Sequence, residues 1–510
     1  MNPRLLIVFF IFIICLCSCI SAKIHNYHFN QKTAAPQLQQ DVVLLKKILE
    51  ANHPSLYWYT PKDSIDAAFS QVVNSIKDSL TEVEFRNKVA YVVNKIRCGH
   101  TAVRFSKNYA NALEKHRYPS FPLAIKTWND SMVVLGSLFP RDSIFKRGTI
   151  ITSINHKTNK QLLDSMFKLI STDGYSNNFK SQVFSANFSS WYKLAFGVDS
   201  CYTIGYIDNL GNEQTTMIKN YLPAKDTIKR KKDTLTILPP MPPSIAKKPS
   251  RHQVKQQQLL AKRSLLIDTV NNTAFMRVAT FSNGRLRSFF RRSLRTIKEK
   301  AIKNVVLDLR ENTGGKLNNS TLLTKYFINK PFKTGDTVAS ITKSIHYKKY
   351  IPQAYTYWFP MQNFSHKKAD GRFHKLREER HFYRPKTTNH FNGDIYLLQG
   401  GYTFSAGTLF VGNLKGQNNV TVVGEETGGG YYGNSALFLP TIILPNSKLR
   451  LVLPLARLVV DGSRIKNGRG VVPDVLIEPS SIAIKQGIDL KMITLKQIIS
   501  KKMAVSSTSN

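Results

Sequence analysis

The sequence predicts an α/β fold divided into several domains. In the C-terminal half, apolar runs of strand length alternate with helical patterns, which is typical of a largely parallel sheet. The N-terminal part carries three helical patterns, and short β-rich runs lie between these two regions. With 510 residues the chain is too long for one ordinary core, so we expect two to four domains.

The changes of pattern give the predicted boundaries. They are a signal peptide at 1–18, a tether at 19–36, a helical domain at 37–117, a β-rich domain at 118–222, a basic Pro/Lys/Gln-rich linker at 223–262, an α/β core at 263–500 and a disordered tail at 501–510.

The N-terminus has the composition of a secretion signal. Arg4 precedes an apolar stretch at 5–16 that is too short to span a membrane comfortably. The ending Leu16-Cys17-Ser18-Cys19 resembles a bacterial lipobox, which would make Cys19 the lipidated first residue of an exported, cell-envelope protein. An uncleaved anchor and ordinary signal cleavage are the alternatives.

The helical domain ends in a candidate general base. Its third helix opens with Thr81-x-x-Glu84, a capping-box spacing, and Gly99 is in the position of a helix stop. His100 follows, and an imidazole has its proton affinity near neutral pH. A lone histidine here is otherwise an ordinary surface or capping residue.

The β-rich region resembles a PDZ domain at one element. Residues 148–155 resemble the PDZ element Gly-(Asp)-x-Ile-x-x-Ile-Asn-Gly, except that His156 stands where the final glycine is usual. A PDZ domain would take an extended peptide as an added strand, whereas a β-domain without a ligand is the alternative. The following residues, including Lys229–Lys232 and Pro239–Pro243, cannot bury enough apolar surface to fold, so we expect a mobile linker.

In the α/β core, two predicted strands end in chemically distinctive turns. Residues 304–309 lead to Gly314-Gly315, and residues 395–398 lead to Ser405. Parallel sheets place their sites at the carboxyl ends of the strands. Ser405 would lie at a helix N-terminus, where positive partial charge favours an oxyanion, although helix capping is the plainer role. The aperiodic stretch 343–390 is expected to pass over this site.

Composition limits the partners and the ligands. Lysine and arginine number 73 against 32 acidic residues, a net charge of +41, which attracts polyanions in general. No nucleic-acid motif accompanies the charge, so no nucleic acid is expected as a partner. Only Cys98 and Cys201 lie outside the N-terminal segment, and no Cys/His spacing fits a metal site, so no metal is predicted.

Several blocks occur in the order typical of one peptidase family. The chain resembles the C-terminal processing (tail-specific) serine peptidases and their tricorn-core relatives from about residue 38 to 480. The resemblance rests on Asn52-His53-Pro54, Gly99-His100-Thr101, Asp308–Gly315, Thr403–Ala406, Val423–Gly430 and Gly470–Asp474. It implies a crotonase/ClpP-like core with a PDZ-like insertion, and peptide-bond cleavage by a serine without any cofactor.

The resemblance also assigns roles to residues. The Ser/Lys branch has a lysine about two dozen residues after the serine, but Gly428, Gly429 and Gly430 stand there instead, as a substrate-groove element. The tricorn-like branch takes its base from a histidine before the insertion. Ser405 is then the nucleophile, His100 the base, and the oxyanion site is the N–H of Ala406 with that of Gly314 or Gly315.

One part of the tricorn-like pattern is missing. Members carry a glutamate before the late Gly-Val-x-Pro-Asp block, but residues 464–470 contain no carboxylate, and Gly99 replaces a serine that would connect it to the histidine. Asp461 is the nearest acid and is the candidate to orient the histidine; a bare Ser/His pair or a weakened enzyme are the alternatives.

The predicted function is that of an exported, membrane-anchored serine endopeptidase acting on proteins or peptides. The alternatives are a catalytically silent peptide-binding lipoprotein and a basic lipoprotein that binds envelope polyanions. The substrate and the oligomeric state are not determined.

Overall fold

The computed structural model describes residues 27–223 and 249–508. The predicted signal peptide, Cys19 and the basic and proline-rich stretches at 229–232 and 239–243 lie outside these residues. Within the described ranges, no helix is both long enough and apolar enough to cross a membrane.

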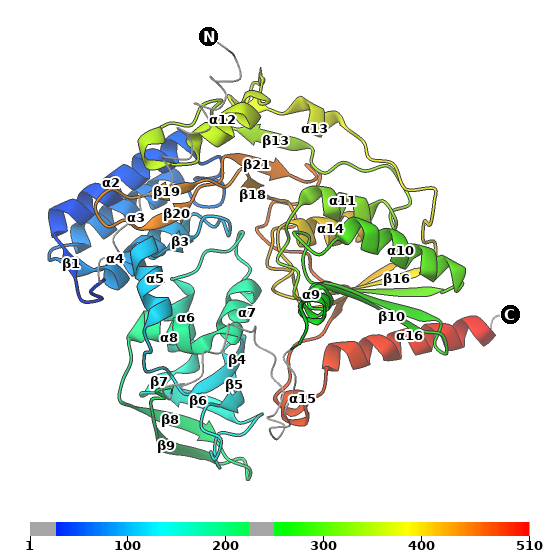
Figure 1. Cartoon of the computed structure of the whole chain (residues 1–510), viewed down its shortest axis with the longest axis horizontal. Coiled ribbons are helices and arrows are strands. Elements are labelled where there is room, and N and C mark those ends of the chain that lie inside the picture. Colours follow the sequence, from blue (N-terminus) through cyan, green and yellow to red (C-terminus); the bar gives the residue numbers. More distant parts are fainter. Residues whose placement is uncertain (1–26, 224–248, 509–510) are drawn as a thin grey trace.

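The N-terminal helical domain forms as predicted from its apolar periodicity. Its helices are α2 (Ala35–Asn52), α3 (Lys62–Ser75), α4 (Glu82–Lys95) and α5 (Lys107–Lys115), and the first three bury one continuous apolar face (Figure 1). The capping box at the start of α4 is present, because the Thr81 side chain accepts from the Glu84 N–H while the Glu84 carboxylate accepts from the Thr81 N–H.

The β-rich domain is a curled antiparallel sheet of strand order β4-β5-β6-β8-β9, with β7 paired to β6. Its elements are β4 (Leu123–Trp128), β5 (Ser131–Ser137), β6 (Ile150–Ile154), β7 (Lys157–Thr158), β8 (Cys201–Ile207) and β9 (Glu213–Lys219). Asn155 and His156 turn between β6 and β7 with φ of 47° and 62°, so His156 adopts the conformation that glycine usually supplies. Three helices were not predicted: α6 (Asn159–Phe167), α7 (Asn178–Ala186) and α8 (Phe188–Phe196).

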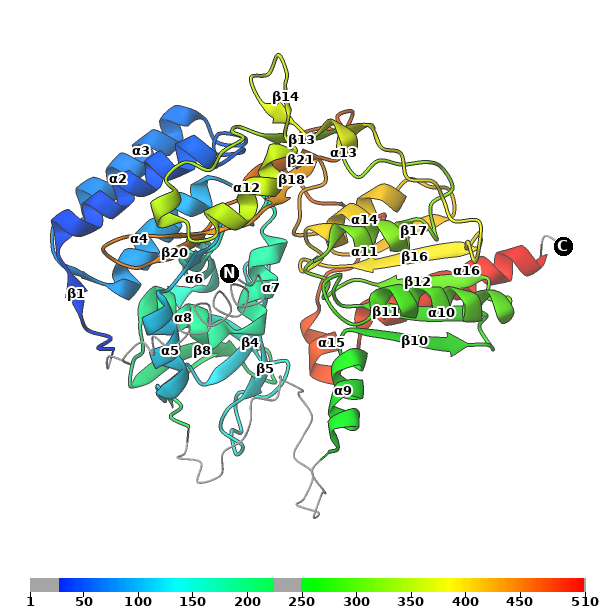
Figure 2. The same ribbon diagram turned by 45° about the horizontal axis from the view of Figure 1, so that its top comes forward.

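The α/β core is built on a six-stranded sheet of order β10-β11-β12-β16-β17-β22. All neighbours from β11 onward are parallel, as predicted, and β10 is an antiparallel edge. The strands are β10 (Arg263–Asp268), β11 (Thr273–Val278), β12 (Asn304–Asp308), β16 (Asp394–Gln399), β17 (Val420–Gly424) and β22 (Val475–Leu476). Helices α10 (Leu286–Glu299), α11 (Leu317–Thr324) and α14 (Ala406–Leu414) cover one face, and α16 (Leu490–Thr508) covers the other (Figure 2).

Two smaller sheets connect the core to the N-terminal domain. One has the order β14-β15-β13-β21-β18, from β14 (His366–Lys367), β15 (Phe373–His374), β13 (Thr337–Ser340), β21 (Ala456–Val459) and β18 (Gly433–Leu437). The other joins β19 (Thr441–Ile443) and β20 (Arg450–Val452) to β3 (Val103–Arg104). Because β3 follows His100 almost directly, its pairing with β20 holds the end of the N-terminal domain against the core.

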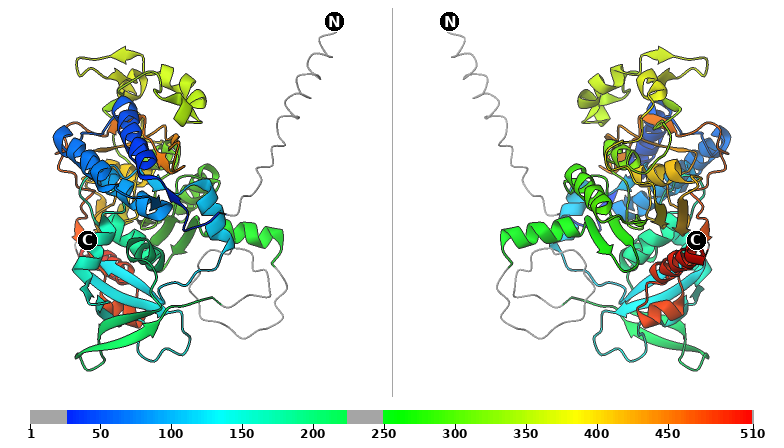
Figure 3. Two further views of the ribbon diagram at one scale, coloured as in Figure 1. Left: turned by 90° about the vertical axis from the view of Figure 1, so that its left-hand side faces the viewer. Right: turned by 90° about the vertical axis from the view of Figure 1, so that its right-hand side faces the viewer.

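Two expectations about irregular segments need correction, and a third segment, 343–390, contains helices that its aperiodic pattern did not indicate. Residues 343–390 include α12 (Ala354–Gln362) and α13 (Leu376–Arg380). Apolar residues from this stretch join the core of the N-terminal helices, at the opposite end of the molecule from β8 and β9 (Figure 3). The predicted linker ends in a capped, exposed helix, α9 (Arg251–Leu260). The predicted tail from residue 501 is helical to Thr508, because it continues α16, which is held by the buried Leu495 and Ile499.

Candidate active site

Ser405 lies at the predicted strand–turn–helix junction in an unusual conformation. Its φ of 50° and ψ of −122° are rare for a residue with a side chain. Within the described chain its hydroxyl makes no capping bond to α14, so the capping role is not realised. The turn is held from both sides, since the Thr403 hydroxyl donates to the Leu309 carbonyl at 2.9 Å and the Thr408 hydroxyl donates to the Thr403 carbonyl at 3.0 Å.

The turn after β12 packs directly on this serine. Gly314 has a φ of 99°, and a Cβ at this position would lie 2.7 Å from the Ser405 Cβ, so only glycine fits. The Gly314 N–H already donates to the Asn312 Oδ1 at 2.8 Å. Among the described residues the N–H groups of Gly315 and Ala406 have no acceptor, which makes them the pair available to an oxyanion.

His100 is brought to the serine loop from the N-terminal domain. Its ring centroid lies 4.9 Å from that of Phe404, the neighbour of Ser405. The next residue, Thr101, is bonded through its hydroxyl to the Nε2 of the buried His53 at 2.8 Å. The His53 Nδ1 accepts from the Ser55 N–H, so the His53 proton is on Nε2, and burial lowers the pKa of His53 to about 3. No hydrogen bond joins His100 to Ser405 in the described structure.

Gly99 has a different role from the predicted helix stop. Helix α4 ends at Lys95, and Arg97 takes the left-handed conformation with a φ of 58°. A Cβ on Gly99 would instead lie 2.5 Å from the Phe404 Cζ and 3.1 Å from the Asp173 N atom. The glycine is therefore required by close packing between the His100 turn and the Ser405 loop.

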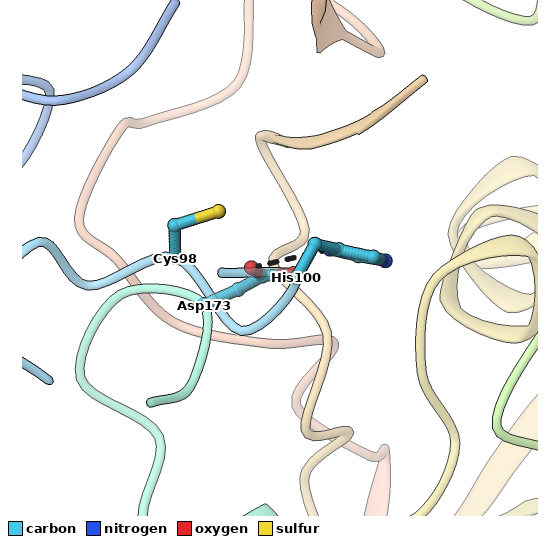
Figure 4. A group of neighbouring side chains, drawn as sticks. All are labelled: Cys98, His100 and Asp173. Atoms are coloured by element: carbon cyan, nitrogen blue, oxygen red, sulfur yellow. Dashed lines mark ion pairs between the residues drawn. The ribbon is translucent and has the colours of Figure 1, made fainter. Parts of the chain in front are cut away.

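The carboxylate beside His100 is Asp173, which the sequence analysis did not identify. Its Oδ1 accepts from the Gly99 N–H at 2.8 Å and lies 3.8 Å from the His100 Nδ1 (Figure 4). Asp173 is 2% exposed. The segment that contains Asp173 is fixed to the turn from Arg97 to His100, because the Gly174 N–H donates to the Arg97 carbonyl at 3.0 Å.

Asp461, the acid nearest in the sequence pattern, does not contact His100. It accepts from the backbone N–H and the hydroxyl of Ser463 and pairs with Arg464, and its side chain is 40% exposed. These local contacts lower the pKa of Asp461, with the Ser463 hydrogen bond as the largest cause.

The predicted groove glycines lie beside the same site but are buried. The N–H groups of Gly428 and Gly429 donate to the Thr403 carbonyl, and a Cβ on Gly429 would lie 3.0 Å from the Ser405 N atom. The Gly428 carbonyl accepts from the Thr172 hydroxyl at 3.4 Å. The run therefore packs between the serine loop and the Asp173 segment, and its role in substrate binding stays a prediction.

Two further residues of the site gave no signal in the sequence. Phe179, at the start of α7, stacks on Phe404 with ring centroids 4.8 Å apart, so the β-rich domain contacts the serine loop. Cys98 is buried beside Asp173, and burial together with the Asp173 charge raises the pKa of the thiol to about 12. Cys98 and Cys201 are both free thiols.

Comparisons with known proteins agree with this geometry at the level of family and fold. Residues 272–477 match the family model described as "Peptidase family S41", which supports the resemblance to C-terminal processing peptidases for this part of the chain. A search of curated proteins gave no match.

Solved structures are similar over most of the length. Mature CPAF complexed with lactacystin gives a TM-score of 0.61 at 12% identity, covering 91% of this chain and 98% of that one. Mature CPAF gives 0.58 at 12% identity, covering 88% and 94%. The photosystem II D1 C-terminal processing protease gives 0.40 at 13% identity, covering 87% and 94%. At these identities the CPAF likeness shows a shared mixed α/β fold.

Proposed function

We propose that this chain, which carries a peptidase family S41 domain, is an exported, membrane-anchored serine endopeptidase of the C-terminal processing type. One observation carries the proposal. At the carboxyl edge of the parallel sheet, Ser405 stands in a strained turn without capping its helix, and the neighbouring Phe404 packs on the ring of His100. The N–H groups of Gly315 and Ala406 have no acceptor among the described residues, and the His100 Nδ1 lies 3.8 Å from the buried Asp173 carboxylate.

The geometry supports an acyl-enzyme mechanism. His100 takes the proton from the Ser405 hydroxyl as the oxygen attacks the scissile carbonyl, and the N–H groups of Ala406 and Gly315 stabilise the resulting oxyanion. His100 then gives the proton to the leaving amine, and water hydrolyses the acyl-enzyme with His100 again acting as base. Asp173 stabilises the imidazolium, since Nδ1 needs to move by only about 1 Å to reach hydrogen-bond distance of Oδ1.

Substrate delivery and location complete the proposal. The β-rich domain, as a PDZ-like module, takes an extended peptide on a free sheet edge, and the mostly exposed β9 is such an edge. Lipidated Cys19 anchors the protein in the cell envelope, where proteins or peptides are its substrates. This part rests on the sequence pattern, because Cys19 lies outside the described residues.

A fluorophosphonate probe tests the proposal. We expect the folded protein to be labelled, the labelling to disappear in Ser405→Ala, and the rate of labelling to fall sharply in His100→Ala. Labelling that is indifferent to His100 would contradict the assigned base. A folded protein that stays unlabelled would be a catalytically silent peptide-binding protein instead.

A further inference from the structure

Three side chains with metal-ligating atoms meet within the candidate active site. The Cys98 Sγ, a ring nitrogen of His100 and a carboxylate oxygen of Asp173 all lie within 4.8 Å of one another. Figure 4 shows the Asp173 carboxylate between the Cys98 thiol and the His100 ring. No local spacing in the sequence indicates this cluster, because Asp173 is 74 positions from Gly99.

The cluster contains polar atoms that the protein leaves unpartnered. The His100 Nδ1 and the Asp173 Oδ2 are buried and have no hydrogen-bond partner in the described structure. Their side chains are 10% and 3% exposed. An unpartnered buried polar atom costs about 1–3 kcal/mol, so the site favours a ligand that binds both atoms. The peptidase mechanism uses neither the Asp173 Oδ2 nor the Cys98 thiol.

We propose that Cys98, His100 and Asp173 bind a divalent cation of the Zn²⁺ class, and that this cation holds the peptidase in an inactive state. Sulfur, imidazole and carboxylate together form a donor set that suits Zn²⁺, with water in the fourth position. Mg²⁺ and Ca²⁺ prefer six or more oxygen ligands, so this site discriminates against them.

The observed spacing requires only small side-chain rotations. Ligand atoms around a tetrahedral zinc ion are separated by about 3.4–3.6 Å, given bond lengths of about 2.0–2.3 Å. The His100 Nδ1 and the Asp173 Oδ1 are already 3.8 Å apart. As the metal–sulfur bond forms, the thiol releases its proton to solvent.

Inhibition follows from the tautomer that the cation imposes, and this step rests on the proposed function. A neutral imidazole that binds a metal through Nδ1 carries its proton on Nε2. His100 then has no lone pair to accept the Ser405 proton, and Asp173 no longer supports an imidazolium. The bound cation therefore prevents His100 from acting as a base and Asp173 from stabilising the imidazolium.

Cobalt spectroscopy on the full chain tests the binding without reference to activity. Titration with Co²⁺ is expected to give a near-ultraviolet thiolate-to-cobalt charge-transfer band in the wild type and in the matched control Cys201→Ala, and to lose it in Cys98→Ala. Zn²⁺ should displace the band. If Cys98→Ala fails to fold, Asp173→Asn serves as the second variant and should weaken Co²⁺ binding at least about tenfold. Absence of the band in the wild type, or a band unchanged in the folded variants, overturns the proposal.

A second experiment measures the peptidase rate of each protein with added Zn²⁺ and compares it with the rate of the same protein without Zn²⁺. We expect Zn²⁺, but not Mg²⁺, to inhibit the wild type, with a half-inhibitory concentration that rises at least about tenfold in Cys98→Ala and not in Cys201→Ala. Equal inhibition of all three proteins, or activation by Zn²⁺, overturns the inhibitory role. If the protein has no peptidase activity but still shows the Cys98-dependent cobalt band, the proposed function is wrong and the metal site is retained.

Discussion

Replacing Asp173 by asparagine removes the negative charge behind His100 while keeping the shape of the side chain. The amide oxygen can still accept from the Gly99 N–H, which holds Asp173 at 2.8 Å. The variant therefore isolates the electrostatic contribution of the carboxylate to catalysis.

The distance in the structure gives the expected size of the effect. A unit charge on the imidazolium and one on the carboxylate, 3.8 Å apart with an effective dielectric constant of about 20, attract each other by about 4 kcal/mol. This attraction exists only when His100 is charged, as it is in the transition state of the proposed mechanism. We therefore expect kcat to fall by about 10³-fold in Asp173→Asn.

The assay is hydrolysis of an unstructured protein substrate such as casein, with active sites counted by fluorophosphonate titration and folding checked by thermal melting. Asp461→Asn is the matched control, since that side chain bonds to Ser463 and Arg464 and, in the described structure, does not contact His100. Its kcat should stay within about twofold of the wild type. A folded Asp173→Asn protein with a kcat within about threefold of the wild type would refute the assignment of Asp173.

Two further predictions concern the residues around the base. Gly99→Ala places a Cβ 2.5 Å from the Phe404 Cζ, so we expect about 1–3 kcal/mol of destabilisation together with lost activity, measured by urea unfolding and casein hydrolysis. Gly136→Ala, whose Cβ would meet nothing within 4 Å, is the control, and equal behaviour of the two variants would contradict the packing role. His53 has its pKa lowered to about 3 by burial, so the unfolded chain binds its proton first as pH falls below about 6.5. This contribution to stability is complete above that pH and is lost toward pH 3, by about 2 kcal/mol at pH 5. We measure the free energy of unfolding in urea at pH 7.5 and at pH 5. The difference between the two pH values should be smaller in His53→Gln by about the same amount, and an unchanged difference would contradict the assignment to His53.

The local sequence was sufficient to predict the elements that have a clear period or a cap. The three N-terminal helices, the capping box at Thr81 and Glu84, and the parallel strands before Gly314 and Ser405 all form where predicted. Apolar periodicity and cap chemistry depend on residues a few positions apart, so a single sequence contains them. Helices α6, α7 and α8 were missed because their region was interpreted from its strand-like runs alone.

The arrangement of the candidate site was decided by tertiary structure. Sequence order alone left the oxyanion partner open between Gly314 and Gly315, and only the bond from Gly314 to Asn312 leaves Gly315 as the free donor. Likewise, Asp461 was the nearest acid in the sequence pattern, whereas Asp173 lies 3.8 Å from the His100 Nδ1 because its segment folds onto the Arg97 turn.

The sequence by itself therefore determined which strand ends carry the serine and the glycines, and which histidine precedes the β-rich domain. Only the tertiary structure decided which carboxylate lies beside that histidine and why Gly99 must be a glycine. The physical reason is that these contacts join residues far apart in the chain. Their meeting depends on how whole domains pack, and no local period or spacing specifies that packing.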